Sequence, residues 1–562
     1  MSATATTFPK EALLPYEAAV RILAWIGVDT VFGGSGEADA VLLIALKGTP
    51  SIKTVTVRNE QAASFMACGY AMFSDRLGVC FSTAGPGEFN LLSGLAVALS
   101  DSLPVLALSG FVGAAGVGKG ALNEASGLHR TPNSPAIFAA TTKGNFTIGA
   151  PDQTCDVLEG AINLALEGRP GPVHVHVPAD VADRTLSNYR DIQLHIKPVS
   201  PEPDRIAAAA QLLATALRSG EGVLALLGYG VIRSHAEAAV LDLLEAFGIP
   251  FVTTMDAKGV LPENHPLAEG VFGTSGDASA NAAFRESKVV LAVGNSFAQN
   301  ATFGFSPALY EGKRLIHVNI DPHEINKVYI ADCAIVSEAR LAIEALAAAL
   351  RELRPPRQPP RAPGRDRYHF EQIQPLADGI HPGLLVQNLS KVLPDRAIVL
   401  GDAGAHMLWL SAYLQLNGGQ VYQNPGSFGP MASSVNAAMG IKAANPDRVV
   451  VCGCGDGGYL MGGFELVTAV HNNLPVIWIV FNNGELGIVK YFQRILHHAT
   501  AFTEVPTPDL VTYAYACGAL GYRIRKLEDF APAFTEAVAS KRPALLDVAI
   551  NPAIDPPYRR SL

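Results

Sequence analysis

Gly455-Asp456-Gly457 is followed by 24 residues, 458–481, and then by Asn482-Asn483. Apolar runs lie at 449–451, before this stretch, and at 474–481, at its end. The pattern predicts a strand, a tight turn, a helix and a second strand. Both polar tips would then lie at the carboxyl ends of neighbouring parallel strands, where open α/β sheets bind their ligands.

The side chains at these two tips suit a hard cation. Asp456 supplies a carboxylate and Asn483 an amide oxygen, and such oxygen ligands fit Mg²⁺, which usually keeps substrate phosphates in its shell. Gly457 and Gly458 would let backbone N–H groups approach a diphosphate at the start of the helix. A lone Gly-Asp-Gly is a common turn, but the spacing, the strands and the paired Asn together favour a metal and diphosphate site.

This stretch resembles the diphosphate-binding motif of thiamine-diphosphate enzymes, most closely that of the acetohydroxyacid synthase and 2-oxo acid decarboxylase group. The resemblance covers nearly the whole chain. It implies that thiamine diphosphate is the cofactor and that Asp456, Asn483 and the carbonyl of Glu485 hold Mg²⁺.

Composition excludes several classes of protein. A chain of 562 residues, 49% hydrophobic and 17% charged, allows about three or four globular domains. The net charge of -9 without a basic block gives no footprint for nucleic acid. The seven Cys show no disulfide or zinc spacing, which favours reduced thiols. No signal pattern opens the chain and no apolar run approaches the roughly 18 residues of a membrane span, so we expect a soluble cytoplasmic protein.

Two Pro-rich stretches, 197–203 and 354–365, divide the chain, because such sequences continue neither helices nor strands. We expect domains at 1–190, 200–352 and 370–552. Each alternates short apolar runs with helical patterns, which predicts the α/β class with three doubly wound parallel-sheet domains. By the resemblance they are the pyrimidine-binding, central and diphosphate-binding domains.

The first and third segments echo each other. Gly87 closes a Gly-Pro-Gly turn and is followed 16 residues later by Leu103-Pro104, whereas Gly457 is followed 17 residues later by Leu474-Pro475. The two segments therefore look like divergent copies of one strand-turn-helix-strand unit. Only the third has an Asp at the turn, so only the third could bind a metal there.

The resemblance also assigns the activation of the cofactor. In this group a carboxyl within an Arg-His-Glu-Gln stretch polarises N1′ of the pyrimidine, so that C2 of the thiazolium can lose its proton. The matching residues are 58–61, Arg-Asn-Glu-Gln. The resemblance therefore gives this role to Glu60, although a Glu in the first turn of a helix is by default only a favourable dipole partner.

Two loops of the third segment resemble further cofactor contacts. The Gly-x-Met element of the family matches 429–431, so Met431 would press the cofactor into its bent shape, and the backbones of Gly429 and Met431 would bond the pyrimidine. The loop 401–406 resembles one in which a Gly and a His touch the diphosphate, which implies Gly404 and His406.

The middle segment resembles the family's central domain, which holds FAD in acetohydroxyacid synthases and is only structural in many relatives. Its Leu-Gly-Tyr-Gly at 227–230 lacks the third glycine of a dinucleotide fingerprint. The synthases have Arg-Phe-Asp-Asp-Arg where this chain has Asn-Ser-Phe-Ala-Gln at 295–299. The loss of these charges leaves FAD open.

The choice between decarboxylase and carboligase depends on side chains that the decarboxylases carry and this chain lacks. Those relatives carry a paired His-His in the first domain and a Glu six residues after the metal Asn, where Val489 stands here. Glu37 does stand where they have an Asp. Because proton donors near C2 favour aldehyde release, the balance favours a carboligase that decarboxylates pyruvate or a similar 2-oxo acid and transfers the acyl unit to a carbonyl acceptor.

The acceptor pocket departs from the synthases. They place Phe-Gln-Glu in the first domain and a Trp after the metal loop, whereas this chain has Leu-Asn-Glu at 122–124 and Phe492. The resemblance makes Asn123 a substrate residue. The following stretch, 127–133, looks closer to an outlying branch that includes cyclohexane-1,2-dione hydrolase and acetyl-transferring sugar carboligases.

Two other functions stay open. One is a lyase or hydrolase that opens a 1,2-diketone or a 2-hydroxyketone, and the other, ranked last because Glu60, Asp456 and Asn483 are all present, is a non-catalytic relative. In the family the cofactor lies between the first domain of one subunit and the third of its partner, which implies a homodimer or homotetramer. The pattern names neither the donor nor the acceptor, and it assigns no role to His129 or His498.

Overall fold

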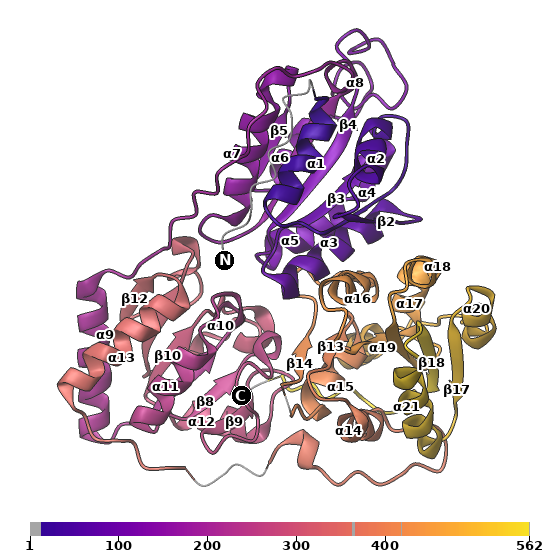
Figure 1. Ribbon diagram of the computed structural model, residues 1–562. Coiled ribbons are helices and arrows are strands. Elements are labelled where there is room, and N and C mark those ends of the chain that lie inside the picture. Colours follow the sequence, from indigo (N-terminus) through magenta and orange to yellow (C-terminus); the bar gives the residue numbers. More distant parts are fainter. Residues whose placement is uncertain (1–12, 362–365, 418, 561) are drawn as a thin grey trace. The chain divides into compact units, whose positions relative to one another are not determined.

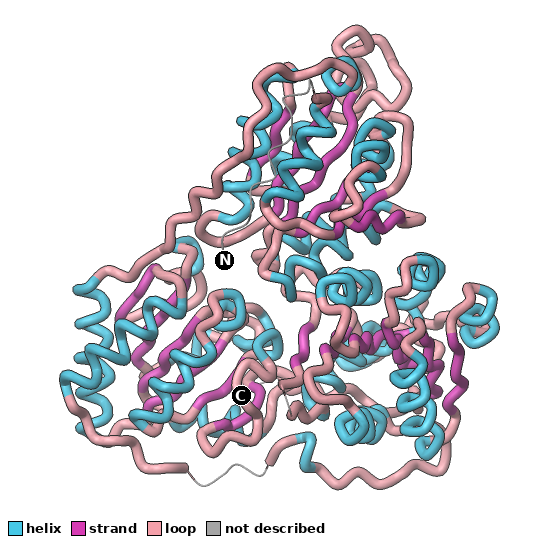
Figure 2. The backbone as a smooth tube through the Cα atoms, in the orientation of Figure 1, coloured by secondary structure: helices cyan, strands magenta, loops and turns pink. Residues whose placement is uncertain are grey.

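The computed structural model describes residues 13–361, 366–417, 419–560 and 562. Its named strands form three six-stranded sheets, and every strand pair in them is parallel. Helices flank each sheet (Figures 1 and 2). The predicted fold class, three doubly wound α/β units, is confirmed. The predictions about the first twelve residues and about 362–365 lie outside the described residues.

The first sheet has the strand order β2-β1-β3-β4-β6-β5. Its strands are β1 (Thr30–Gly33), β2 (Lys53–Thr56), β3 (Gly78–Ser82), β4 (Val105–Phe111), β5 (Gly144–Thr147) and β6 (Pro172–Pro178). Its helices are α1 (Pro15–Trp25), α2 (Ala40–Lys47), α3 (Glu60–Ser74), α4 (Pro86–Asn90), α5 (Leu92–Ser100), α6 (Ser134–Thr141), α7 (Thr154–Leu166) and α8 (Ala179–Ala182).

The middle sheet has the order β12-β11-β10-β7-β8-β9. Its strands are β7 (Val223–Leu227), β8 (Phe251–Thr253), β9 (Ala268–Val271), β10 (Val289–Val293), β11 (Arg314–Asn319) and β12 (Cys333–Val336). Its helices are α9 (Pro203–Ser219), α10 (Gly230–Arg233), α11 (Glu237–Phe247), α12 (Ala278–Glu286) and α13 (Ala339–Leu353).

The third sheet has the order β14-β13-β15-β16-β18-β17. Its strands are β13 (Ile398–Gly401), β14 (Val421–Gln423), β15 (Val450–Gly455), β16 (Val476–Asn482), β17 (Leu520–Ile524) and β18 (Ala544–Ala549). Its helices are α14 (Pro382–Val392), α15 (Ala405–Tyr413), α16 (Ser433–Ala444), α17 (Asp456–Gly462), α18 (Leu466–His471), α19 (Gly487–His497), α20 (Leu510–Ala516) and α21 (Phe530–Ser540).

The first and third sheets share one strand order. Numbered within its own segment, each runs second, first, third, fourth, sixth, fifth. The Gly-Pro-Gly turn follows the third strand of the first sheet, and the Gly-Asp-Gly turn follows the third strand of the third sheet. This shared topology is what two divergent copies of one unit require.

The chain forms two compact units. One comprises the residues up to Ile196 together with Met439–Asn445, and the other comprises Lys197–Ala438 together with Pro446–Leu562. All seven cysteines are unpaired, and only Cys517 is not fully buried. None of the described helices combines the length and the apolar character that a bilayer crossing needs.

Candidate functional site

The two polar tips of the third sheet lie side by side. β15 pairs with β16 in parallel, with Gly455 opposite Phe481, so Asp456 and the Asn483 loop leave the sheet at the same edge. The Asp456 carboxylate accepts backbone N–H groups from Gly457 (2.8 Å) and from Gly484 (2.7 Å). One carboxylate therefore joins the start of α17 to the loop after β16.

A small cavity of about 60 Å³ opens between these two tips. Its lining includes Met431, predicted to shape the cofactor, together with all the residues that were predicted to hold the metal and the diphosphate: Gly404, His406, Asp456, Gly457, Gly458, Asn483 and Glu485. The structure thus gathers in one place residues from four separate stretches of the chain.

Two glycines of this cavity are required by close approach. A Cβ on Gly458 would lie 2.5 Å from Oδ2 of Asp402, and a Cβ on Gly404 would lie 2.5 Å from Cε1 of His406. Gly404 also has a positive φ of 151°, which side chains with a Cβ rarely adopt. Any larger residue at either position would push these side chains out of place.

The electrostatics of the cavity are compatible with a bound cation. Burial raises the pKa of Asp456, although the N–H groups of Gly457 and Gly484 act in the opposite direction. Burial also lowers the pKa of His406 to about 4, so its imidazole is neutral at pH 7, and its buried Nε2 has no hydrogen-bond partner among the described residues. A divalent cation beside Asp456 would favour the carboxylate, and the donor set of carboxylate, amide and carbonyl oxygens fits Mg²⁺.

Asp402 is a functional candidate that sequence reasoning passed over. It follows β13, is fully buried, and accepts the backbone N–H groups of Ala432 (2.8 Å) and Ser434 (3.0 Å). Burial raises the pKa of Asp402 to about 7, against the opposing effect of these N–H groups. The carboxyl therefore clamps the loop that carries Met431. The signal was a polar residue directly after a buried strand.

The Met431 loop lies against the diphosphate turn. A Cβ on Gly457 would lie 3.3 Å from Cε of Met431, so the methionine side chain packs on the backbone of that turn. Gly429 has a positive φ of 51° and lines a second, larger cavity.

The larger cavity measures about 930 Å³, which is within the range of about 300 to 1,000 Å³ for ligand pockets. It is lined by the middle and third segments, and it shares Ala403, Gly404 and Ile488 with the small cavity. Phe492 lines it together with Tyr558, and the two ring centroids are 5.1 Å apart. The structure therefore places Phe492 beside the candidate cofactor cavity.

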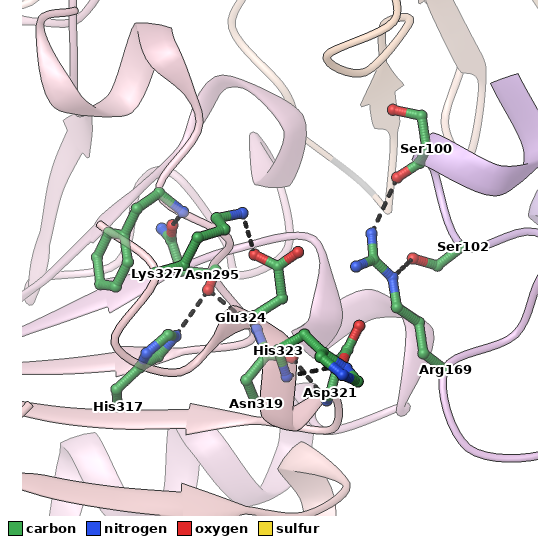
Figure 3. Close-up of polar contacts among 11 residues, drawn as sticks. Ser100, Ser102, Arg169, Asn295, His317, Asn319, Asp321, His323, Glu324 and Lys327 are labelled. Atoms are coloured by element: carbon green, nitrogen blue, oxygen red, sulfur yellow. Dashed lines mark hydrogen bonds and ion pairs between the residues drawn. The ribbon is translucent and has the colours of Figure 1, made fainter. Parts of the chain in front are cut away.

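Charge is sparse on the side of this cavity formed by the middle segment. Lys327 is the only cation among the described residues that line it, and Lys327 pairs with Glu324 (Figure 3). The carbonyl of Asn295 accepts from Nε2 of His317 (2.8 Å) and from Nδ2 of Asn319 (3.0 Å). The cavity thus has polar amides where the synthases carry arginines.

Glu60 lies in the other compact unit, at the first position of α3. The side chain of Asn59 caps this helix by accepting the N–H of Gln61 (2.9 Å). Nδ2 of Asn90 donates to Oε2 of Glu60 (2.9 Å). Cβ atoms on Gly34 and Gly87 would lie 2.8 and 3.2 Å from Oε1, so two glycine turns close around the carboxyl.

The glycine loop after β1 separates two acidic residues. Glu37 is exposed, whereas Asp39 is fully buried and accepts the N–H of Gly36 (2.8 Å). Burial raises the pKa of Asp39 to about 6, and the charge of Glu60 adds to this rise. Asp39, which sequence reasoning missed, is therefore a buried acid in the same glycine loop, and the charge of Glu60 contributes to its raised pKa.

The predicted substrate loop is organised by Glu124. Its carboxylate accepts the N–H groups of Gly118, Gly120 and Ala121 and the hydroxyl of Ser126. The Ser126 hydroxyl and then the Gly118 N–H lower the pKa of Glu124. Asn123 is the residue before Glu124. It is half-buried and has a positive φ of 59°.

The two histidines without an assigned role share a conformation. His129 and His498 are both exposed, with positive φ values of 50° and 54°. His498 caps the C-terminal end of α19. His498 therefore has a structural role at the end of this helix.

Comparison with known proteins gives three family matches in chain order. Residues 16–147 match the N-terminal TPP binding domain of thiamine pyrophosphate enzymes, residues 206–346 their central domain, and residues 402–548 their C-terminal TPP binding domain.

Relatives extend over nearly the whole chain. The probable acetolactate synthase large subunit of Methanocaldococcus jannaschii is 34% identical over 96% of this chain and 92% of that protein. The acetolactate synthase of Mycobacterium leprae is 31% identical over 96% of this chain and 88% of its own length. The acetolactate synthase large subunit of Corynebacterium glutamicum is 31% identical, with coverage of 96% and 87%.

Proposed function

The chain belongs to the thiamine pyrophosphate enzyme family, and from this premise we propose that it is a carboligase that uses thiamine diphosphate and Mg²⁺. Its donor would be pyruvate, because the relatives that span it are acetolactate synthases. The acyl unit left after loss of CO₂ would pass to a carbonyl acceptor. The three domains of the family would be 1–190, 200–352 and 370–552.

One observation carries this proposal. The cavity at the edge of the third sheet is lined by the oxygen donors Asp456, Asn483 and Glu485 and by the glycines at the start of α17. A diphosphate site needs ligands for a divalent cation and backbone N–H groups at the start of a helix, and the lining of this cavity contains candidates for both roles. The larger cavity next to it offers room for substrates.

Each proposed residue has a separate task. Asp456, Asn483 and the carbonyl of Glu485 would hold Mg²⁺, and Gly457, Gly458, Gly404 and His406 would surround the diphosphate. When bound, thiamine diphosphate supplies a nucleophilic carbon that adds to the carbonyl of a 2-oxo acid.

The remaining residues act on the pyrimidine end and on the substrates. Glu60 would hold the proton shared with the pyrimidine ring, and Gly429 and Met431 would orient that ring. Asn123 and Glu37, in loops of the first unit, would contact substrate.

FAD is not part of the proposal, because the charges of the larger cavity do not fit it. The diphosphate of FAD carries two negative charges, whereas the single lysine of the described lining, Lys327, already pairs with Glu324. A protein purified without added flavin should therefore be colourless. Stoichiometric flavin absorbance would contradict this reading of the cavity.

A second candidate reaction is the opening of a 1,2-diketone or a 2-hydroxyketone. The observation that favours it is the same lining, in which Lys327 and Asp256 are the only charged side chains among the described residues and to which Phe492 and Tyr558 both contribute. Such a surface suits neutral carbonyl compounds. The carboligase and the lyase would use the same cofactor and differ in which carbonyl compound occupies the larger cavity.

We propose a homodimer or homotetramer in the cytoplasm. Glu60 and Asp456 belong to different compact units, and in the family the cofactor lies between such domains of two subunits. The unpaired cysteines favour a reducing compartment.

Product analysis tests the proposed function directly. The purified protein is incubated with pyruvate and with pyruvate plus an aldehyde or a diketone, each with and without thiamine diphosphate and Mg²⁺. We expect cofactor-dependent CO₂ release and a new 2-hydroxyketone. Cleavage of the diketone without pyruvate would favour the lyase, and the absence of any cofactor-dependent product would refute both.

A further inference from the structure

The core of the first unit contains a polar cluster that the proposed reaction does not use. Glu88 of α4 and His174 and His176 of β6 are all fully buried. The two histidines are two residues apart on one strand, so both side chains point to the same face of the sheet. Their ring centroids are 4.3 Å apart.

These groups form one continuous chain of hydrogen bonds. Its successive distances are 2.8 Å from Asn145 Oδ1 to His174 Nδ1, 2.9 Å from His174 Nε2 to Ser109, 3.1 Å from Ser109 to Glu88 Oε2, 3.0 Å from Glu88 Oε2 to His176 Nε2, and 2.8 Å from His176 Nε2 to Ser134. Burial lowers the pKa of His174 well below its usual range, and His176 adds to this effect. His174 is therefore neutral.

The same three residues have the composition of a metal site. Ligand atoms of Glu88, His174 and His176 lie within 4.8 Å of one another. A zinc ion would need to lie about 2.0 to 2.1 Å from each Nε2. The hydroxyls of Ser109 and Ser134 lie 2.9 and 2.8 Å from those nitrogens, so both Nε2 atoms already have hydrogen-bond partners. The geometry favours a closed hydrogen-bond network.

Such a network adds little to stability. Burying a carboxyl and an imidazole has a desolvation cost that their mutual attraction offsets only in part. Apolar replacements of such pairs therefore often leave the free energy of unfolding unchanged. Here Oε1 of Glu88 and Nδ1 of His176 also lack hydrogen-bond partners among the described residues, and each such atom has a further cost. A role in placement explains the cluster better than a role in stability.

The element that the network places is α4. This helix has only five residues, Pro86–Asn90, and helices so short have no stability of their own. Glu88 and Asn90 are two positions apart, so their side chains leave the helix roughly 200° apart. Glu88 enters the core, and Asn90 reaches Oε2 of Glu60 at 2.9 Å on the other side.

We propose that Glu88, held by His176 and Ser109, is a positioning residue for Glu60. The buried anchor fixes α4, and α4 fixes the Asn90 amide that orients the Glu60 carboxyl. Gly87, the residue before Glu88 in α4, lies close to the same carboxyl, because a Cβ there would lie 3.2 Å from Oε1 of Glu60. This inference rests on the proposed function, in which Glu60 activates the cofactor.

The test compares kinetic constants of the full-length enzyme. Glu88→Leu keeps the volume and removes the acceptor, so kcat should fall on the order of 10- to 100-fold, as expected for a slightly misplaced catalytic group. KM for thiamine diphosphate should not change, since the diphosphate and metal residues lie in the other unit. Glu88→Gln, whose amide oxygen can replace Oε2, should keep most of the activity.

A matched control is Glu269→Leu in the middle segment. Glu269 is also buried, pairs with Arg361 and has one carboxylate oxygen without a partner, so the variant removes a similar group elsewhere. We expect its kcat to equal that of the wild type. Equal kcat values for Glu88→Leu and Glu269→Leu would overturn the proposal, and so would stoichiometric zinc that is present in the wild type and lost in Glu88→Leu.

A second variant tests the same proposal if Glu88→Leu does not fold. Asn90→Ala acts on the exposed side of α4 and should lower kcat to a similar extent. If both residues act through one path, the double variant should be no slower than either single variant. Wild-type kcat for Asn90→Ala, or losses that multiply, would refute the link.

Glu60→Gln, measured alongside, separates the two hypotheses. Turnover that survives this change refutes the activation role in the proposed function. Turnover that is lost at Glu60, with control-like behaviour at Glu88, refutes only the positioning of Glu60 by α4.

Discussion

Glu60 is the residue on which turnover should depend most strongly. Glutamine at this position has the same volume but cannot share a proton with the pyrimidine ring. We expect Glu60→Gln to lower kcat by about 10²- to 10⁴-fold, the usual contribution of an acid or base. Calorimetric titration should show that Mg²⁺ and thiamine diphosphate still bind, because their ligands lie in the other unit. Near-normal turnover would refute the activation role.

Asp456 should control the metal. Its carboxylate is buried and joins α17 to the loop after β16, so Asp456→Ala removes both the proposed metal ligand and a contact between two elements. Losing even an outer partner of a metal ligand costs about 10- to 100-fold in affinity, and we expect a larger loss of Mg²⁺ affinity here.

Titration of the apoprotein with Mg²⁺ and thiamine diphosphate measures the effect of Asp456→Ala. Asp242→Ala, which removes an exposed carboxylate paired with Arg351, is the control and should bind normally. Unchanged affinity in Asp456→Ala would show that the metal lies elsewhere.

Residues that act next to a strand end could be predicted, whereas residues that act through distant partners could not. Asp456 and Asn483 follow neighbouring strands. The alternation of apolar runs was therefore enough to predict that they lie close together. The Glu88 carboxyl meets His176, which is 88 positions away, and Glu124 is satisfied by the N–H groups of its own loop. No periodicity in one sequence reports either contact.

At the scale of elements, the loop that carries Met431 depends on Asp402. The raised pKa of about 7 means that the folded protein retains this proton between about pH 4 and 7, where the unfolded chain releases it. Stability therefore falls as the pH rises through this window, by at most about 1.4 kcal/mol per pKa unit.

Asp402→Asn should remove this dependence. Asparagine is neutral at every pH. The melting temperature of the variant apoprotein, relative to that of the wild type, should therefore rise between pH 4 and pH 7. Melting curves recorded at intervals of about one pH unit measure this trend. The amide also replaces one acceptor for Ala432 or Ser434, which costs stability at all pH values. A constant difference in melting temperature across the window would contradict the buried-acid interpretation.

The elements themselves were easier to predict than their ends. The apolar run before the Gly-Asp-Gly turn forms β15, and Glu60 stands in the first turn of a helix, as the sequence predicted. Two Leu-Pro steps at nearly equal distances from a glycine turn predicted that the first and third segments are copies of one unit, and the two sheets do share one strand order. The clamp on the 429–434 loop was missed because it joins a carboxylate to backbone N–H groups, which carry no side-chain signal.

At the scale of the whole molecule, activity should require at least a dimer. Glu60, which we propose acts on the pyrimidine, and Asp456, which we propose holds the metal, lie in different compact units, and the resemblance to the family implies a cofactor site completed across two subunits. We expect sedimentation to show a dimer or tetramer, and dilution below the dissociation constant to abolish turnover. A monomer with full activity would contradict this prediction.

The choice of acceptor should follow from two replacements that distinguish this chain from the synthases. Asn123 is one methylene shorter than their Gln, and Phe492 lacks the indole N–H of their Trp. One methylene changes discrimination by only about 1 to 3 kcal/mol, whereas a site built to hydrogen-bond its substrate rejects analogues more strongly when that bond is lost. The lining around Phe492 and Tyr558 is uncharged apart from Asp256 and Lys327, and Lys327 pairs with Glu324.

A second pyruvate brings a carboxylate that this lining holds poorly, so a neutral aldehyde, ketone or diketone should be the better acceptor. We expect kcat/KM for neutral acceptors to exceed that for acetolactate formation, and Asn123→Gln to shift the preference back towards pyruvate. Leu122→Ala, which alters the exposed neighbour of Asn123, is the control and should leave the preference unchanged. If acetolactate formed as efficiently as every product of a neutral acceptor, the two replacements would not set specificity, and other residues would have to select the acceptor.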